Sequence, residues 1–541
     1  MTVAAPPAVA GEAGPEPAAA ARKAPNPWAV AVTVALTTFM EVLDMSIANV
    51  ALAHIAGDMG AGQDEATWVL TSYLVANAII LPISGWVATM FGRRRFYIGC
   101  VAVFTVSSFL CGIAPSLWVL IVARVLQGAG GGGLQPSSQA ILSDTFPPAK
   151  RGMAFAVYGI TTVMAPAIGP TLGGWITDSF NWRWIFFINI PVGLLSLVLS
   201  SRLVFDPPQL QELRASIRLR GFRIDYIGFA LLTIGFGFLQ IILDKGERED
   251  WFDSNMILFL GVAAVVSLIA MVWWELRQQD PIVDLRLLKN RNFLVANLFM
   301  FVLGFVLLGS TALLPMYVQS LMGYSATDAG LMLSPGGFSM LLFMPIVGAM
   351  VTRVDVRWMI VFGLAVSGFA LWLLTGVNLT IDFHTLVLLR MLQTAGLAFL
   401  FIPINTAAFA EIPMTKSTNA SAIINLSRNL GGSFGISLIT TWLTRRTQVH
   451  QSVLASDVTG YSARATALLK GLADTFHSAG SDAAEAMSRA QAVVYGMLQK
   501  QASMLAFIDC FFALSVLFVA LIPLTFLMHR PKPTGGPGAA H

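Results

Sequence analysis

Two acidic residues, Glu41 and Asp44, lie three positions apart inside the first long apolar stretch of the sequence. On a helix this spacing places both carboxylates on one face. Arg124 lies in another apolar stretch, and at ~1.5 Å of rise per residue its depth matches that of Asp44. Burial favours a protonated carboxyl group, whereas a nearby guanidinium favours the carboxylate. A pair that separates and re-forms can therefore bind and release a proton.

Other interpretations of these residues stay open. An Asp44–Arg124 salt bridge that never opens would be purely structural. Two neighbouring carboxylates repel each other when both are ionised, so we expect at least one of Glu41 and Asp44 to hold a proton near neutral pH. Gln127 follows Arg124 by about one turn and is suited equally to packing and to hydrogen bonding with an acid or a substrate.

Further polar residues within the apolar stretches are candidates for function, because an ionisable group inside a membrane is costly unless it is used. Together with Gln127 we assign to a substrate path Asn49, Arg390, Arg428 and Asp509. For Arg428 and Asp509 a polar contact between helices is the favoured alternative. Arg390 lies in a segment that repeats the one around Arg124, but the ninth apolar stretch has no acid to face it. We therefore expect proton handling in the first half of the chain.

The elements that must position these residues are membrane helices. Of the 541 residues, 56% are hydrophobic and only 11% are charged, a composition outside the range of water-soluble domains. A helix needs about 20 mostly apolar residues to cross a bilayer. Fourteen such stretches are predicted, over residues 28–52, 66–91, 96–114, 117–143, 152–177, 182–203, 224–243, 255–276, 293–319, 327–351, 357–377, 384–410, 416–443 and 503–528.

The basic residues sort by side of the membrane. The short loops on one side carry only Arg183, Lys245 and Arg248, whereas most other lysines and arginines fall on the opposite side. Because basic residues mark the cytosolic side, we expect both termini in the cytosol, with residues 1–27 as a disordered tail and 529–541 as a second tail. This sorting also argues against nucleic acid as a partner, with lipid as the surrounding medium.

An internal repeat divides the chain. "RVLQGAG" from Arg124 matches "RMLQTAG" from Arg390, 266 residues later. The repeat predicts an N-terminal six-helix half (28–203) and a C-terminal one (293–528), with a substrate path between them. An extra helix pair (224–276) follows a cytosolic linker (204–223) that reads as a basic amphipathic helix. The long outside loop, 444–502, is either a hairpin that docks a partner or a solvated loop.

Several classes of protein are disfavoured by what the sequence lacks. No Gly-Lys pair occurs, so there is no P-loop for ATP. The six histidines are not paired at metal-ligand spacing within a stretch, and the cysteines are Cys100, Cys111 and Cys510, each expected to pack in a helix. We therefore predict no enzyme activity, no metal and no cofactor.

Four motifs in order resemble the major facilitator superfamily, and within it the fourteen-helix drug:proton antiporters of the EmrB and QacA type. They are "LDMSIANVAL", "GWVATMFGRRR", "RVLQGAGGG" and "GPTLGG". The stretches "PPAKR", "WRWIFFINIPVG" and "PIVDLRLLKNRNF" bring the likeness closer to the EmrB branch. The resemblance implies an all-α fold of two six-helix halves plus two inserted helices, and export of hydrophobic toxic compounds driven by the proton gradient.

The resemblance also implies roles for individual residues. Asp44 would be the proton-coupling acid and Arg124 its relay partner. A gating loop would contain Gly85, Gly92, Arg93 and Arg94, and an antiporter motif would contain Gly169, Pro170, Gly173 and Gly174. Thr89 replaces the acid of the family's charge latch, and Thr352 does so in the repeat. Glu41 is an additional acid, which would admit cations or change the proton count.

Location and partners follow from the same resemblance. We expect a bacterial inner-membrane protein that works with a periplasmic adaptor like EmrA and an outer-membrane channel like TolC. The alternative is a symporter or exporter for one metabolite, such as a fatty acid, a siderophore or a peptide, which works alone. The sequence does not identify the physiological substrate, because a hydrophobic cavity with few polar anchors is permissive.

Overall fold

The computed structural model describes residues 26–207, 210–212, 214, 225–279, 281–459 and 461–529. Most of the predicted tails and of the linker 204–223 lies outside these residues. In the described residues the first half contains α1 (Pro27–Val50), α4 (Trp68–Phe91), α5 (Arg93–Gly112), α6 (Leu117–Gly132) continued by α7 (Leu134–Thr145), α8 (Pro148–Ser179), and α9 (Trp184–Phe187) continued by α10 (Asn189–Leu203). Two short helices, α2 (Leu52–Asp58) and α3 (Gln63–Ala66), connect α1 to α4.

The second half follows an inserted pair of helices, α12 (Tyr226–Lys245) and α13 (Asn255–Glu275). Its helices are α14 (Arg291–Met322), α15 (Ala326–Met350), α16 (Val356–Leu373), α17 (Phe383–Phe409), α18 (Ser417–Asp457), α19 (Ala463–Ser478) and α20 (Ala483–Leu521). We call the end of the bundle where α1 begins the tail side, and the end that carries α19 the hairpin side.

Most of these helices are long and apolar enough to cross a membrane. Among the described residues, twelve spans pass this test, and α8, which is bent by 44° between Pro166 and Ile168, makes a thirteenth. The bend is expected, because Pro166 and Pro170 each remove a backbone donor from the helix interior. α18 is more polar, yet it packs along α14 and α20 inside the bundle. The molecule is thus a multi-pass, all-α membrane protein with the predicted two-half architecture.

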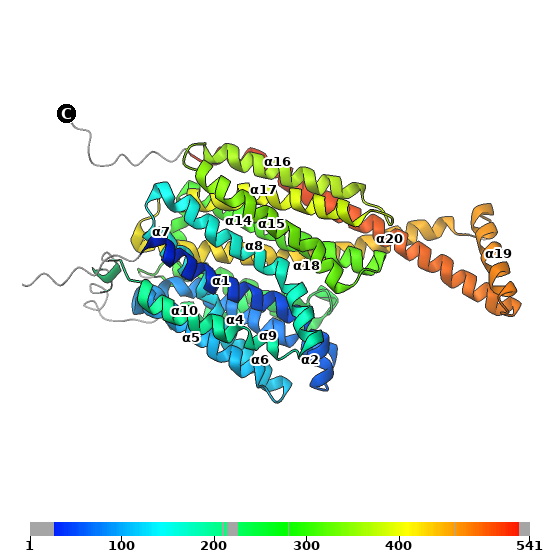
Figure 1. Cartoon of the computed structure of the whole chain (residues 1–541), viewed down its shortest axis with the longest axis horizontal. Helices are drawn as coiled ribbons and strands as arrows, with labels where there is room; N and C mark the ends of the chain where they lie inside the picture. The colour runs from blue at the N-terminus through cyan, green and yellow to red at the C-terminus, as the bar shows by residue number, and fades with distance from the viewer. Residues whose placement is uncertain are drawn as a thin grey trace, which may run out of the picture.

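The two halves meet along a few helices. In Figure 1 the helices α1 to α10 lie in the lower part of the bundle, and α14 to α17 lie above them. α8 packs against α15 and α4 against α18 across this interface. On the tail side the backbones nearly touch: a Cβ on Gly152 would lie 2.8 Å from the carbonyl oxygen of Gly348, and one on Gly85 would lie 2.8 Å from Cα of Asn419. Only glycine permits such close packing.

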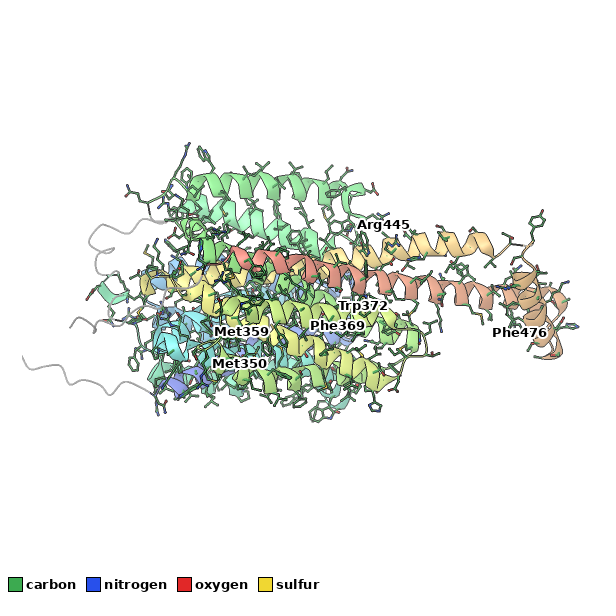
Figure 2. All side chains as sticks on the ribbon, turned by 90° about the horizontal axis from the view of Figure 1, so that it is seen from above. Met350, Met359, Phe369, Trp372, Arg445 and Phe476 are labelled. Atoms are coloured by element: carbon green, nitrogen blue, oxygen red, sulfur yellow. The ribbon has the colours of Figure 1, made fainter. Side chains whose placement is uncertain are left out.

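The predicted outside loop 444–502 is largely a continuation of two bundle helices. α18 extends to Asp457 and α20 begins at Ala483, so the two run side by side out of the bundle (Figure 1). Arg445 marks the base of this hairpin and Phe476, in α19, lies near its far end (Figure 2). At the base, Asp509 accepts a hydrogen bond from Nε of Arg446 at 2.6 Å and lies 2.7 Å from Nε2 of His450. These contacts join α18 and α20 where they leave the bundle.

The inserted pair lies at the periphery of the bundle. α12 and α13 pack against each other, and α12 also contacts α4 and, more weakly, α18. Much of α13 is exposed and apolar, as at Phe259, Val262 and Ile269. Such a surface is suited to contact with lipid chains.

Candidate functional site

The centre of the first half holds a buried ion pair. Nη1 of Arg124, on α6, donates to Oδ2 of Asp44, on α1, at 2.6 Å. Both residues are almost fully buried, at 0% and 2% exposure. A charge pair in such a place has to be completed by further hydrogen bonds, because neither charge retains its water.

Two amide side chains complete the surroundings of the Asp44 carboxylate. Nε2 of Gln127 donates to Oδ1 of Asp44 at 2.9 Å, and Nδ2 of Asn189 donates to the same oxygen at 2.7 Å. Gln127 also accepts from Nη1 of Arg124 at 2.7 Å. The sequence left open whether Gln127 packs or forms a hydrogen bond. In the structure it forms a hydrogen bond with an acid, Asp44. Asn189 opens α10, so α1, α6 and α10 all meet at one carboxylate.

Arg124 is held on its other side by α4. Its Nε donates to the carbonyl oxygen of Val69 at 3.1 Å, and its Cζ lies 4.3 Å from the centre of the Tyr73 ring. A guanidinium over an aromatic face is an attractive cation–π contact. Arg124 therefore keeps favourable contacts even when Asp44 is neutral.

Glu41 belongs to a separate hydrogen-bond network one turn away from Asp44. Gln135, on α7, donates to Glu41 at 2.6 Å, and Tyr73 and Asn77 lie within longer hydrogen-bonding distance, at 3.4 Å and 3.5 Å. The other end of Gln135 accepts a hydrogen bond from Arg428 of α18. This acid is thus connected, through one glutamine, to the second half of the molecule.

The second half contains a matching arginine without an acid. Nη1 of Arg390 donates to Ser310 at 3.1 Å and to Gln393 at 2.9 Å, and its Nη2 donates to Thr311 at 2.6 Å. Gln393 in turn donates to Ser310 at 2.9 Å. In the described part of the chain Arg390 has only these hydroxyl and amide partners.

On the tail side another buried arginine, Arg93, connects the two halves. Arg93, 1% exposed, forms an ion pair with Asp144 of α7. The same guanidinium donates to Ser417 and Thr418 of α18, each at 3.0 Å. Thr89, at the position of the family's acid, instead donates to the carbonyl of Gly85 in its own helix. The acid that pairs with Arg93 is therefore Asp144.

The loop around Arg93 is shaped by Gly92, whose φ of +93° suits glycine. The amide of Arg94 donates to Asp206 at 2.8 Å, which holds this turn against the end of α10. Gly85, Gly92, Arg93 and Arg94 thus all lie at or beside the tail-side contact between the halves.

The predicted antiporter motif packs next to Asp44. A Cβ on Gly173 would lie 3.2 Å from the carbonyl oxygen of Ile47, and a Cβ on Gly169 would collide with the Ser46 side chain. Gly174 faces open space. Gly169, Pro170 and Gly173 thus allow the bent α8 to lie directly against the segment of α1 that carries Asp44.

The remaining predicted residues lie elsewhere. Asn49 is exposed at the hairpin-side end of α1. Asp509 is at the base of the hairpin, bound to Arg446 and His450, away from the Asp44 group. Among the described residues no cluster of three potential metal ligands is present.

Sequence reasoning missed several members of the site. Asn189 lies within "WRWIFFINIPVG", a stretch noted only for its resemblance, and Tyr73 lies in a helix without intramembrane charge. Gln135 is an uncharged residue in the same predicted stretch as Arg124. The repeat contained a usable signal for Ser310, a hydrogen-bond partner of Arg390. Ser310 is 266 residues after Asp44, and the same spacing relates Arg124 to Arg390.

Comparison with known proteins gives consistent matches. The model of the family described as Major Facilitator Superfamily matches residues 34–436. The chain is 41% identical over 432 residues to the multidrug export protein EmrB of Haemophilus influenzae, covering 80% of this chain and 83% of that protein. It is 35% identical over 512 residues to the fatty acid resistance protein FarB of Neisseria gonorrhoeae, covering 94% and 97%. The solved structure of the human organic anion transporter MFSD10 shares the fold, with a TM-score of 0.59 at 14% identity over 93% of this chain and all of that one.

Proposed function

This chain belongs to the major facilitator superfamily of membrane transporters, and from that membership we propose that it is a proton-driven exporter of hydrophobic toxic compounds. The observation that carries the proposal is the buried Asp44 carboxylate with its ligands Arg124, Gln127 and Asn189. The name of the EmrB relative, a multidrug export protein, supports the direction and the class of cargo.

Proton binding at Asp44 would act by releasing α1. Protonation removes the negative charge that attracts Arg124, while Arg124 keeps Gln127, the Val69 carbonyl and the Tyr73 ring. α1 is then held less tightly by α6 and α10. Because α8 packs on α1 at Gly169 and Gly173 and on α15 across the interface, a shift of α1 is passed to the contact between the halves. Proton binding thereby changes the relative stability of two arrangements of the halves.

The cargo would contact the interface between the halves. Stacked aromatic pairs line it, with ring centres 5.6 Å apart for Phe155 and Phe409 and 6.1 Å apart for Tyr158 and Phe401. Close to them, Gln139 accepts hydrogen bonds from Ser421 and Asn425. Aromatic faces with a few amide and hydroxyl groups suit hydrophobic compounds of varied shape.

We further propose that the tail side is cytosolic and that the protein lies in a bacterial inner membrane. In this orientation the Arg93 latch closes the cytosolic end, and the hairpin of α18 and α20 projects into the periplasm. The hairpin would then meet an EmrA-like adaptor, which leads to a TolC-like channel. The adaptor contact is supported by the length of α18 and α20, which continue well beyond the bundle.

The test of proton coupling uses purified protein in vesicles. An imposed pH gradient should drive accumulation of a fluorescent hydrophobic compound, and collapsing that gradient should abolish it. Asp44→Asn should insert normally and lose gradient-driven accumulation. Normal accumulation by Asp44→Asn would refute proton coupling at this residue.

The tripartite part of the proposal needs a separate test. Replacing residues 458–482 with a short glycine-serine linker should remove binding of the purified adaptor and leave transport in vesicles intact. Unchanged adaptor binding would mean that the hairpin is not the docking element.

A second candidate function is export of one metabolite class without partners. The FarB relative, named for fatty acid resistance, favours fatty acids as that class. Transport of a long-chain fatty acid in vesicles, with no transport of unrelated hydrophobic drugs, would establish this alternative.

A further inference from the structure

A groove opens toward the lipid between the first half and the inserted pair. It has a volume of about 940 Å³, and its lining residues come from α4, α6, the α2–α4 connection and α12. α6 and α12 both pack on α4, and among the described residues they make no comparable contact with each other. α4 is therefore the floor of the groove, α6 is its main wall, and α12 borders it at Ile241.

The groove runs along the membrane normal through the hairpin-side half of the bundle. On α4 its lining extends from Trp68 to Ile80, and on α6 from Leu117 to Ala129. At 1.5 Å of rise per residue each of these segments is ~18 Å long. One leaflet of a bilayer has a hydrocarbon thickness of ~15 Å, half of the ~30 Å core. The groove is therefore as long as the hydrocarbon region of a single leaflet.

The lining is that of an acyl-chain site. It is apolar except for Ser72 and Glu65. At the hairpin-side end of the groove lie Trp68 and Trp118, which are 39% and 77% exposed. Tryptophans are typical of the level of the lipid headgroups. Below them the walls are aliphatic down to Ile79 and Ala129.

The width of the groove is fixed by contacts of α12 with α4. At the hairpin-side end Thr71 is hydrogen-bonded to Asp244, and Nζ of Lys245 donates to Thr67 at 3.0 Å while lying 4.6 Å from the Trp68 ring centre. Deeper, a Cβ on Gly237 would lie 3.4 Å from the Ile79 side chain. These contacts hold α12 at the edge of the groove over most of its length.

One polar group in the groove points to the kind of chain that fills it. The Ser72 hydroxyl is buried and has no hydrogen-bond partner among the described residues. It lies one turn below Trp68, ~6 Å deeper at 1.5 Å per residue. This is the level at which the ester carbonyls of a glycerophospholipid lie when the headgroup is beside the tryptophans. Rotation of the Ser72 side chain toward the groove would bring its hydroxyl to such a carbonyl, which would accept the hydrogen bond.

One other occupant fits less well. A free fatty acid would bring its carboxylate to the end where Glu65 lies, and the two negative charges would repel.

We propose that this groove binds one acyl chain of a glycerophospholipid from the hairpin-side leaflet, with an ester carbonyl on Ser72. The chain would support α4 from behind, at the residues next to Val69 and Tyr73, which hold Arg124. The proposal stands independently of the compound that the protein exports.

The experiment is photolabelling in vesicles of phosphatidylethanolamine and phosphatidylglycerol that contain a phospholipid with a diazirine in the middle of one chain. Peptides from α4 (75–80) and α6 (121–129) should be labelled at least about fivefold more than the exposed face of α13 around Val262. Equal labelling of the groove and of α13 would mean ordinary surrounding lipid and would overturn the proposal. This comparison needs no variant.

Two variants and one control variant sharpen the result. Ser72→Ala removes one hydrogen bond and should reduce groove labelling about threefold to fivefold. Ala129→Trp fills the groove and should abolish the excess labelling, whereas Val262→Trp on α13 should preserve it. Displacement of the lipid label by a diazirine fatty acid, or by a transported hydrophobic compound, would overturn the assignment of the groove to a phospholipid.

Discussion

Two buried arginines, one in each half, share a glutamine partner and differ in the third residue of the set, which is an acid in the first half and a serine in the second. Arg124 bonds Gln127 and Asp44, and Arg390 bonds Gln393 and Ser310, with each residue of the second set 266 positions after its counterpart in the first. In both sets the glutamine also donates to the third residue, at 2.9 Å. The repeat thus preserves the arginine and its glutamine, and only the first set contains an ionisable acid at the third position.

Under the proposed mechanism, this difference would assign proton binding to the first half. In the first half, the charge on Asp44 changes with its protonation, and so does its attraction for Arg124. In the second half, Ser310 and Thr311 solvate Arg390 and have no such dependence on pH. The first half would then drive the conformational change and the second would follow it.

The largest expected effect is on transport. Asp44→Asn removes the titratable group and should lower gradient-driven export about 100-fold, the factor that corresponds to ~2.7 kcal/mol. Ser310→Ala removes a hydroxyl of the matching set and should change export by less than about threefold. Initial rates in vesicles with an imposed pH gradient measure both. A comparable loss in Ser310→Ala would erase the proposed difference between the halves.

The next effect is on stability. Arg124→Met leaves the Asp44 carboxylate buried without its cation and should destabilise the protein by about 3–5 kcal/mol. Arg390→Met removes a buried cation that has no carboxylate partner in the described residues, and should cost less than about 2 kcal/mol. Thermal unfolding of the purified variants in detergent compares them. Equal melting temperatures would show that the carboxylate contributes nothing to the first set.

A smaller effect is expected at the tail side, where a buried and a more exposed ion pair can be compared. Asp144→Asn removes the charge partner of Arg93, whose side chain is 1% exposed. The two halves should then separate more often. In a Ser421→Cys background, alkylation of the new thiol should become about tenfold faster. Asp284→Asn breaks the ion pair between Asp284 and Lys416, in which the Lys416 side chain is 46% exposed. This change should alter the alkylation rate less than about twofold. The assay requires a background without Cys100, Cys111 and Cys510. The reverse order of rates would contradict the latch.

The smallest effect concerns Glu41, whose position in the repeat is occupied by Leu307. Glu41→Gln retains hydrogen-bonding capacity but removes the charge, so export of a neutral compound should stay within about twofold of wild type. Export of a hydrophobic cation should fall about fivefold, because a buried carboxylate is the natural partner of a cation. Parallel rates for the two compounds measure the selectivity. Equal loss of both would make Glu41 a coupling residue.

Much of this architecture was predictable because its signals are local. Lengths of apolar sequence located the membrane helices. The depth argument matched Asp44 to Arg124, which the structure joins at 2.6 Å. A bilayer restricts the fold so strongly that depth along a helix becomes a useful coordinate.

What escaped prediction depends on rotation of the helices about their axes. Asn189, Tyr73 and Gln135 carry no charge, so depth alone does not single them out from other polar residues. Asp144 was overlooked because it lies beyond the fourth apolar stretch, in a segment that reads as a loop but is the end of α7. The hairpin was underestimated for a related reason: polar sequence stopped the span at residue 443, whereas the helix continues to Asp457.

That uninterrupted helix has a mechanical consequence. α18 contains 41 residues and starts at Ser417, a hydrogen-bond partner of Arg93. It is ~60 Å long at 1.5 Å per residue, so a tilt of about 5° about its tail-side end displaces the far end by about 5 Å. A small tilt at the tail-side end of α18 is thus amplified at the far end of the hairpin. A partner bound there would be displaced when the tail side of the protein opens or closes.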